Sequence, residues 1–103
     1  MFVRAKNFLK FIYGMESFTV YIIYSASADA YYIGQTSDLE DRLFRHCNSG
    51  SKSTKKAKDW KLVYKEVYES RSESVLRERE IKNKKSRKYI EQLISSSWLD
   101  RPD

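Results

Sequence analysis

The chain has 103 residues, which is enough for one compact core and too few for several domains. Its 20 Lys and Arg residues against 14 Asp and Glu residues give a formal net charge of +6, and this balance favours a polyanionic partner. A single cysteine excludes an intramolecular disulfide, as in proteins of the reducing cytoplasm, where we expect this one. No apolar stretch is long enough to cross a bilayer, so we expect no membrane partner.

The first fourteen residues are hard to assign. Apolar residues recur there at helical spacing among basic ones, but the segment has neither the uncharged core nor the cleavage site of a signal peptide. We therefore treat residues 1–14 as an N-terminal extension, either poorly ordered or absent from the native protein; a docked or membrane-touching helix is the lesser alternative. One domain is expected at residues 15–96 and a frayed tail at residues 97–103, where Pro102 cannot extend a helix.

Two short apolar runs predict a β-hairpin. Residues 18–24 are dense in β-branched and aromatic side chains, and residues 31–34 return after a turn at residues 25–29. A hairpin loop with an even number of residues would place Tyr21 and Tyr32 on the same face of the sheet.

The first predicted helix opens with a capping box at residues 37–40 and ends at residues 48–50. Leu39, Leu43 and Cys47 form its buried stripe. Arg42 and His46 are four residues apart and share one face of this helix. The polar, basic segment from residue 48 to residue 59 is expected to be a mobile loop.

Residues 60–68 predict a third strand, with Trp60, Leu62, Tyr64 and Tyr68 on the same face as Glu66. A second capping box at residues 70–73 starts a helix that runs to about Lys84. A break at residues 85–86 leads to a last helix, whose inward-facing residues are Tyr89, Ile90, Leu93 and Ile94. The order ββαβαα implies an α+β fold, a small three-stranded and largely antiparallel sheet flanked by helices.

An ordered set of residues along this layout resembles the GIY-YIG nuclease superfamily. The paired signature corresponds to Thr19-Val20-Tyr21 and Tyr32-Ile33-Gly34, with Thr19 in place of the first glycine. The further matching residues are, in order, Gln35, Thr36, Leu39, Arg42, His46, Gly50, the run at 60–64, Glu78 and Lys82. The resemblance spans roughly residues 17–94 and looks closest to small stand-alone bacterial members. It implies a three-stranded sheet with the active site on one face.

Glu78 is the acid that the pattern singles out. At 100° per residue it falls on the sheet-facing side of its helix, between Val75 and Ile81. A carboxylate there needs a partner. An ion pair with Lys82, one turn on, is one alternative. A divalent metal is the other, because Mg²⁺ takes oxygen ligands and often uses only one or two carboxylates. The resemblance implies the second, so we expect one Mg²⁺ or Mn²⁺ ion at Glu78.

The remaining catalytic candidates are Arg42, His46 and the two signature tyrosines. Arg42 is either a residue of a solvated helix edge or a clamp on the scissile phosphate, whose oxygens a guanidinium matches two at a time. His46 is either structural or a group that orients a tyrosine, donates to the phosphate or shuttles a proton. The resemblance implies that Tyr21 or Tyr32 activates or positions the attacking water, and it leaves open which. For Glu66 we favour a structural hydrogen-bonding role over that of a second metal ligand.

Two basic segments predict contacts with a nucleic-acid backbone. The loop segment holds Lys52, Lys55, Lys56 and Lys58, and the second segment holds Lys82, Lys84, Lys85, Arg87 and Lys88. Because no base-reading motif is visible, we expect recognition by shape or backbone, with a protein partner as one source of specificity.

The leading hypothesis is a metal-dependent endonuclease that hydrolyses DNA, branched or nicked DNA included, in DNA repair or processing. One rival is a nucleic-acid-binding module of the same fold with little or no cleavage. A weaker rival is an interaction protein whose aromatic residues bind a polypeptide.

Overall fold

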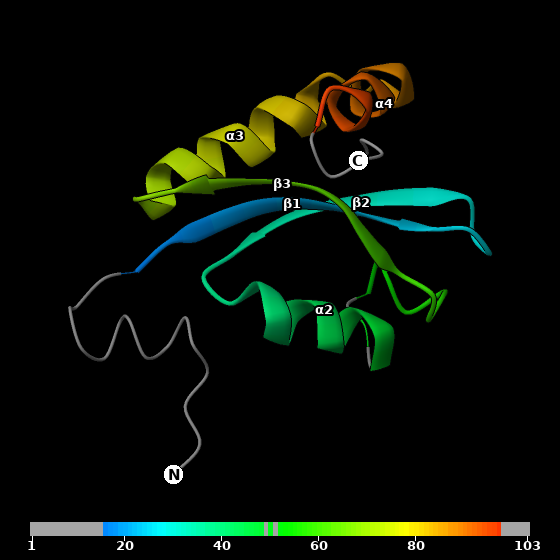
Figure 1. Cartoon of the computed structure of the whole chain (residues 1–103). Coiled ribbons are helices and arrows are strands. Elements are labelled where there is room, and N and C mark those ends of the chain that lie inside the picture. The colour runs from blue at the N-terminus through cyan, green and yellow to red at the C-terminus, as the bar shows by residue number, and fades with distance from the viewer. Residues whose placement is uncertain (1–15, 49, 51, 98–103) are drawn as a thin grey trace, which may run out of the picture.

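A computed structural model describes residues 16–48, 50 and 52–97, and in this part of the chain an antiparallel sheet lies between helices (Figure 1). The elements are β1 (Phe18–Ser25), β2 (Ala30–Thr36), α2 (Leu39–Asn48), β3 (Lys61–Tyr68), α3 (Arg71–Asn83) and α4 (Arg87–Ser95). The predicted ββαβαα order and the α+β class are confirmed. The predicted extension at residues 1–14 and all of the tail but residue 97 lie outside the described residues.

The sheet has the strand order β2-β1-β3, and β1 pairs antiparallel with both neighbours. In the β1–β2 ladder Tyr21 lies opposite Gly34 and Ile23 lies opposite Tyr32. Tyr21 and Ile23 are two residues apart on one strand, so Tyr21 and Tyr32 share a face, as predicted. The central position of β1 explains why four consecutive residues of this strand, Val20 to Ile23, are completely buried.

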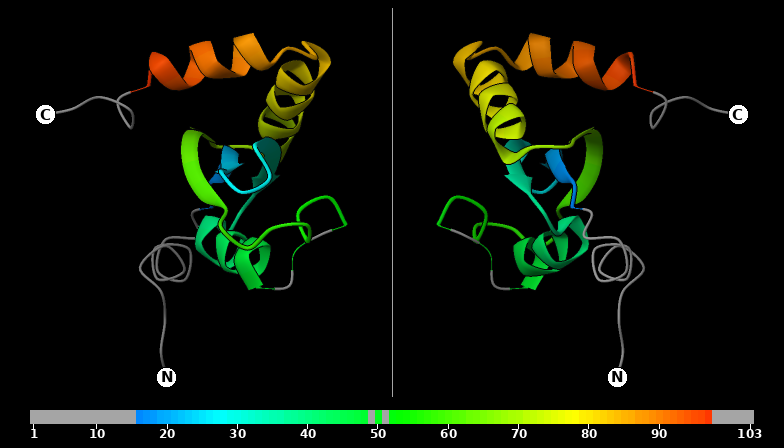
Figure 2. Two further views of the ribbon diagram at one scale, coloured as in Figure 1. Left: turned by 90° about the vertical axis from the view of Figure 1, so that its right-hand side faces the viewer. Right: turned by 90° about the vertical axis from the view of Figure 1, so that its left-hand side faces the viewer.

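Helices cover the two faces of the sheet separately. Helix α2 packs on one face, and α3 and α4 lie over the other (Figures 1 and 2). The core on the α2 side holds Tyr21, Ile23, Ala57 and Trp60. The predicted stripe of α2, formed by Leu39, Leu43 and Cys47, packs partly buried against it. This face therefore holds both signature tyrosines, and α2 closes over them.

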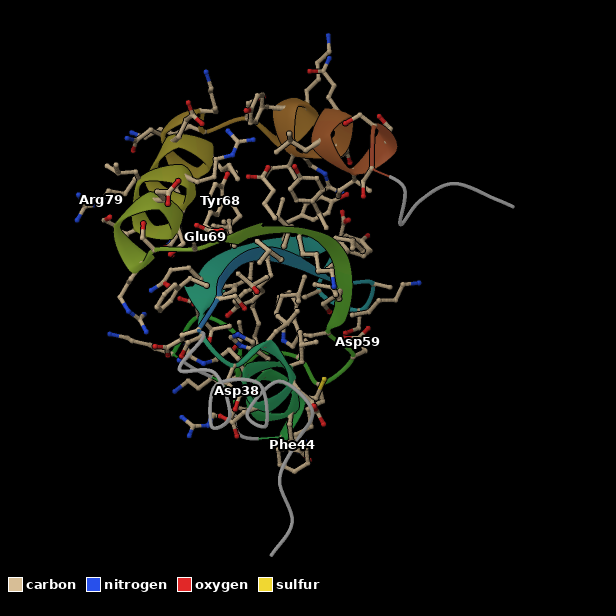
Figure 3. All side chains as sticks on the ribbon, turned by 60° about the vertical axis from the view of Figure 1, so that its left-hand side comes forward. Asp38, Phe44, Asp59, Tyr68, Glu69 and Arg79 are labelled. Atoms are coloured by element: carbon tan, nitrogen blue, oxygen red, sulfur yellow. The ribbon has the colours of Figure 1, made fainter. Side chains whose placement is uncertain are left out.

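A β-bulge in β3 divides its side chains between the two faces. Ile22 pairs with Tyr64, but the next residue of β1, Ile23, pairs with Leu62, so Val63 is an extra residue in the ladder. Trp60 and Leu62 consequently belong to the α2 side. Tyr64, Glu66 and Tyr68 lie on the α3 side, where Figure 3 shows Tyr68. The prediction that these five residues share one face was wrong, because strict alternation does not anticipate a bulge.

Side-chain caps begin the helices. Ser70 accepts a hydrogen bond from the backbone N–H of Glu73 at 3.2 Å, which confirms the predicted start of α3 with Ser70 as its N-cap; the Glu73 carboxylate accepts from the Ser70 hydroxyl at 2.9 Å. Helix α2 is capped instead by Asp38, whose carboxylate accepts from the Asp41 N–H at 3.1 Å, so its cap lies one residue later than predicted. The predicted break before α4 is present: Lys85 has a φ of 49°, and Ser86 caps the new helix.

Within residues 16–48, 50 and 52–97, no helix combines the length and the apolar character that a membrane span requires.

Candidate active site

A buried tyrosine–histidine pair lies at the centre of the α2 face. The Tyr21 hydroxyl is 2.8 Å from Nε2 of His46, and both side chains are buried. Burial raises the pKa of Tyr21 above its ordinary value, and the neighbouring Tyr32 adds to the effect, so the phenol keeps its proton at neutral pH. Burial also lowers the pKa of His46, with help from the Arg42 guanidinium. The pair is therefore neutral near pH 7.

Gly34 makes room for this pair. It lies opposite Tyr21 in the ladder, and a Cβ atom built on it would be 2.5 Å from the Tyr21 hydroxyl oxygen and 2.7 Å from the ring carbon that carries it. The tyrosine ring therefore lies across the backbone of β2 where only a glycine leaves space.

Tyr32 completes an aromatic cluster around His46. Its ring centroid is 4.9 Å from that of His46 and 6.3 Å from that of Tyr21. Tyr32 is half-buried, whereas Tyr21 is fully buried. The two signature tyrosines thus differ in surroundings, and of the two it is the Tyr21 hydroxyl that hydrogen-bonds the histidine.

Arg42 acts on the same pair from one turn earlier on α2. Its positive charge lowers the pKa of Tyr21, against the larger effect of burial. Its charge also lowers the pKa of His46. Arg42 is half-buried and so keeps a route to solvent. The predicted partnership of Arg42 and His46 on one helix face is present, with Tyr21 as its third member.

Glu78 comes from the other side of the sheet. Helix α3 packs against β1 and β2, and the Ser74 hydroxyl donates to the Gln35 side chain of β2 at 3.2 Å. The Glu78 side chain, 19% exposed, accepts a hydrogen bond from Lys82 Nζ at 2.8 Å, so the ion-pair alternative is realised in this structure. Its negative charge also contributes to the raised pKa of Tyr21, and this places Glu78 within electrostatic reach of the pair.

The expectation that the whole site occupies one face is only partly correct. Tyr21, Tyr32, Arg42 and His46 share the α2 side, whereas α3 carries Glu78 over the opposite face (Figure 1). Strand β2 is an edge strand, so the two faces meet around its free edge. A ligand that contacts Glu78 and the tyrosines together would lie along that edge.

The residues present fit one hydrated Mg²⁺ or Mn²⁺ ion better than a protein-enclosed metal site. Among the described residues no group of three or more His, Cys, Asp or Glu side chains could hold a metal. Glu78 offers a single, partly exposed carboxylate, and Mg²⁺ commonly keeps its waters and takes its other ligands from a substrate phosphate. Both ring nitrogens of His46 already have hydrogen-bonding partners, so His46 is not a ligand in this arrangement.

Thr54 is a site residue that the sequence analysis missed. Its hydroxyl is 2.9 Å from Nδ1 of His46, and its side chain is completely buried. The Trp60 indole N–H donates to the Thr54 carbonyl at 2.8 Å, and Trp60 itself is buried. The expected mobile loop is thus docked at Thr54, Ala57 and Trp60 while its lysines are exposed. A single threonine among lysines has no periodic pattern that would identify it as buried. The apolar residues Ala57 and Trp60 are the sequence features that indicate packing of this loop against the core.

The two basic segments lie on the same side of the molecule. In the left panel of Figure 2 the loop and the corner between α3 and α4 both project beside β2. Lys52, Lys55, Lys56 and Lys58 are exposed, as are Lys82, Lys84, Lys85 and Arg87.

The second segment is partly neutralised by acids of this chain. Arg87 pairs with Asp29 at 2.7 Å and with Glu91 at 3.2 Å, and it lies over the Tyr31 ring. Lys82 pairs with Glu78. A contact between Arg87 and a nucleic acid remains a prediction, and it would compete with these ion pairs.

Glu66 has a structural role on the α3 face. It accepts hydrogen bonds from Arg77 Nε and Nη2, both at 2.9 Å, from the Tyr68 hydroxyl at 2.5 Å and from the Tyr64 hydroxyl. Its carboxylate is thus occupied by three side chains, as the favoured interpretation predicted.

Comparisons with known proteins agree with this architecture. Residues 17–90 match the model of the GIY-YIG catalytic domain. The UPF0213 protein SSP2268 of Staphylococcus saprophyticus is 35% identical over 82 residues, which cover 79% of this chain and 98% of that protein. A UPF0213 protein of Staphylococcus aureus is 41% identical over 69 residues, 66% of this chain and 83% of its own.

A solved structure shows the same fold. It is the solution NMR structure of the UPF0213 protein BH0048 from Bacillus halodurans, with a TM-score of 0.51, 30% identity, and coverage of 79% of this chain and 85% of that one. By sequence and by fold, the chain therefore belongs to the GIY-YIG family of nuclease domains.

Proposed function

We propose that the protein is a metal-dependent endonuclease that hydrolyses phosphodiester bonds of DNA. The observation that carries the proposal is the buried hydrogen bond between Tyr21 and His46, with Arg42 acting on the same hydroxyl. A tyrosine, a histidine and an arginine meet here on the α2 face, and the partly exposed acid Glu78 lies over the opposite face within electrostatic reach. The family supports the reaction class.

The geometry favours Tyr21 over Tyr32 as the group that accepts a proton from the attacking water. A phenol with a raised pKa is a poor base if it must first lose its proton to solvent. In contact with His46 it does not need to, because its proton can pass to Nε2 while its oxygen takes the proton of the water. The new bond from the water oxygen to phosphorus then forms as the bond to the leaving oxygen breaks.

Arg42 and Glu78 have separate roles in this proposal. Arg42 holds a phosphate oxygen and stabilises the negative charge that develops on the phosphate. Glu78 would hold the Mg²⁺ or Mn²⁺ ion, which supplies positive charge at the phosphate and the leaving oxygen. Lys82 keeps the Glu78 carboxylate in place and is the group that a metal ion would displace.

The substrate is DNA approached along the β2 edge. The loop lysines and the α3–α4 corner flank this edge on one side of the molecule (Figure 2). Phosphate contacts of this kind give affinity without base recognition. Branched or nicked DNA, in which the continuous duplex is interrupted, suits a site at a sheet edge. A protein partner would then supply specificity, in DNA repair or processing in the cytoplasm.

A cleavage panel tests the proposal. Duplex, nicked, branched and single-stranded DNA are incubated with the full chain and Mg²⁺, Mn²⁺ or a chelator. We expect cleavage that requires the metal and that Glu78→Gln abolishes. Glu73→Gln is the matched control, because it removes the same charge from an exposed position on the same helix. Salt-dependent binding without cleavage under any of these conditions would favour the binding-module alternative instead.

A further inference from the structure

Thr54 connects the loop to the Tyr21–His46 pair. Its hydroxyl is 2.9 Å from Nδ1 of His46, on the opposite side of the imidazole from Tyr21. All three side chains are buried, so each hydrogen bond forms away from water. The loop segment with the exposed lysines therefore contributes one buried hydroxyl to the site.

The state of the Tyr21 hydroxyl decides which nitrogen of His46 carries the hydrogen. The phenol is protonated and buried, and the Arg42 guanidinium, which can only donate, cannot accept its proton. The phenol proton then needs an acceptor, and Nε2 of His46 lies 2.8 Å away. In a neutral imidazole one nitrogen donates and the other accepts, so the hydrogen of His46 lies on Nδ1 and points to Thr54.

We infer that Thr54 is a positioning residue that holds His46 in its Nδ1–H tautomer, leaving Nε2 free to accept the Tyr21 proton. The inference rests on the proposed function for its catalytic consequence. Without the Thr54 oxygen, the Nε2–H tautomer would gain in population, because that hydrogen could be donated to the Tyr21 oxygen instead. In that state His46 cannot take the phenol proton.

The backbone of Thr54 is fixed independently of its hydroxyl. The Trp60 indole N–H donates to the Thr54 carbonyl at 2.8 Å, and the Ala57 backbone N–H donates to the same oxygen at 3.3 Å. A substitution that changes only the hydroxyl leaves both bonds available. Thr54→Val therefore tests the hydroxyl, and Thr54→Ser keeps it.

Nitrogen NMR of the imidazole reads the tautomer directly, because His46 is the only histidine of the chain. In the ¹⁵N-labelled wild type at neutral pH we expect a protonated Nδ1 and an unprotonated Nε2. In Thr54→Val we expect a shift towards Nε2–H, and in Thr54→Ser the wild-type pattern. Ser53→Ala is the control, since it removes an exposed hydroxyl from the same loop.

Cleavage kinetics measure the consequence. We expect kcat of Thr54→Val to fall by about 10- to 100-fold, similar to the loss when a hydrogen-bond partner that orients a metal-bound histidine is removed, with a much smaller change in KM. Thr54→Ser and Ser53→Ala should stay close to the wild type. If Thr54→Val does not fold, two other results test the inference: the tautomer of His46 in the wild type and the cleavage kinetics of Thr54→Ser.

Hydrogen on Nε2 in the wild type, or an unchanged tautomer in a folded Thr54→Val, would overturn the inference. Failure of the wild type to cleave any DNA would instead overturn the proposed function and leave the NMR result to judge the tautomer.

Discussion

The ring of Tyr21 lies directly over Gly34 on the neighbouring strand, and this overlap sets the position of the buried hydroxyl against His46. A Cβ atom at residue 34 would be 2.5 Å from that hydroxyl oxygen. The glycine of the second signature motif, Gly34, thus leaves the space that the tyrosine of the first motif, Tyr21, occupies. A larger residue at position 34 of β2 would collide with the Tyr21 side chain of β1.

Gly34→Ala should displace the Tyr21 ring and break its hydrogen bond with His46. We expect turnover to fall by more than tenfold and the free energy of unfolding to fall by about 1–3 kcal/mol, the usual cost of overpacking a core. Urea denaturation and single-turnover cleavage measure the two effects. Wild-type turnover in this variant would mean that the position of the Tyr21 ring is not critical.

Arg42→Ala should lower turnover by orders of magnitude and weaken DNA binding less, because the guanidinium is worth most against transition-state charge. Arg42→Lys should not restore the rate, since an ammonium cannot grip two oxygens in a fork. Loss of the Arg42 charge should also raise the pKa of His46, which that charge lowers. NMR titration of the single histidine checks this shift without any substrate.

Arg45→Ala is the matched control for Arg42. Arg45 lies on the same helix, is exposed and pairs with Asp41 at 3.0 Å. We expect near wild-type turnover and an unchanged pKa of His46. Equal losses in the two variants would indicate that helix charge in general, and not the Arg42 position, supports cleavage.

Replacement of Lys52, Lys55, Lys56 and Lys58 by Ala should weaken binding to all DNA sequences alike. The slope of log K against log salt should become shallower by roughly 0.7–0.9 for each phosphate that the variant no longer neutralises. Saturated single-turnover cleavage should change much less, because Thr54 and the Tyr21–His46 pair remain. An unchanged salt slope would indicate that the second basic segment binds the DNA instead. Replacement of Lys84, Lys85 and Lys88 by Ala then tests that segment.

The free energy of unfolding should decrease as the pH falls below about 6.5. Burial, with the Arg42 charge, lowers the pKa of His46 in the folded protein below its value of 6.5 in an unfolded chain. Between these two pKa values the unfolded state binds more protons, so the stability present above pH 6.5 is lost towards the folded pKa. Urea denaturation from pH 7.5 to pH 5 measures this loss, and His46→Gln should remove most of it. An equal slope in that variant would assign the dependence to other groups.

The sequence by itself determined the features that depend on neighbours along the chain. Side chains alternate between the two faces along each strand, and the loop between the strands has an even number of residues, so Tyr21 and Tyr32 lie on one face. Spacing of four residues put Arg42 and His46 on one side of α2, and Ser70 with Glu73 marked the start of α3. Each of these relations spans a few residues and follows from a fixed helix or strand period.

Tertiary structure decided the relations that join distant segments. The bulge at Val63 moved Tyr64 and Glu66 to the opposite face from Trp60, against the alternation. Thr54 meets His46 in a loop that Ala57 and Trp60 anchor to the core, and no local pattern marks that contact. Such partners depend on strand register and on how the core fills, which are properties of the packed chain and not of any short stretch of it.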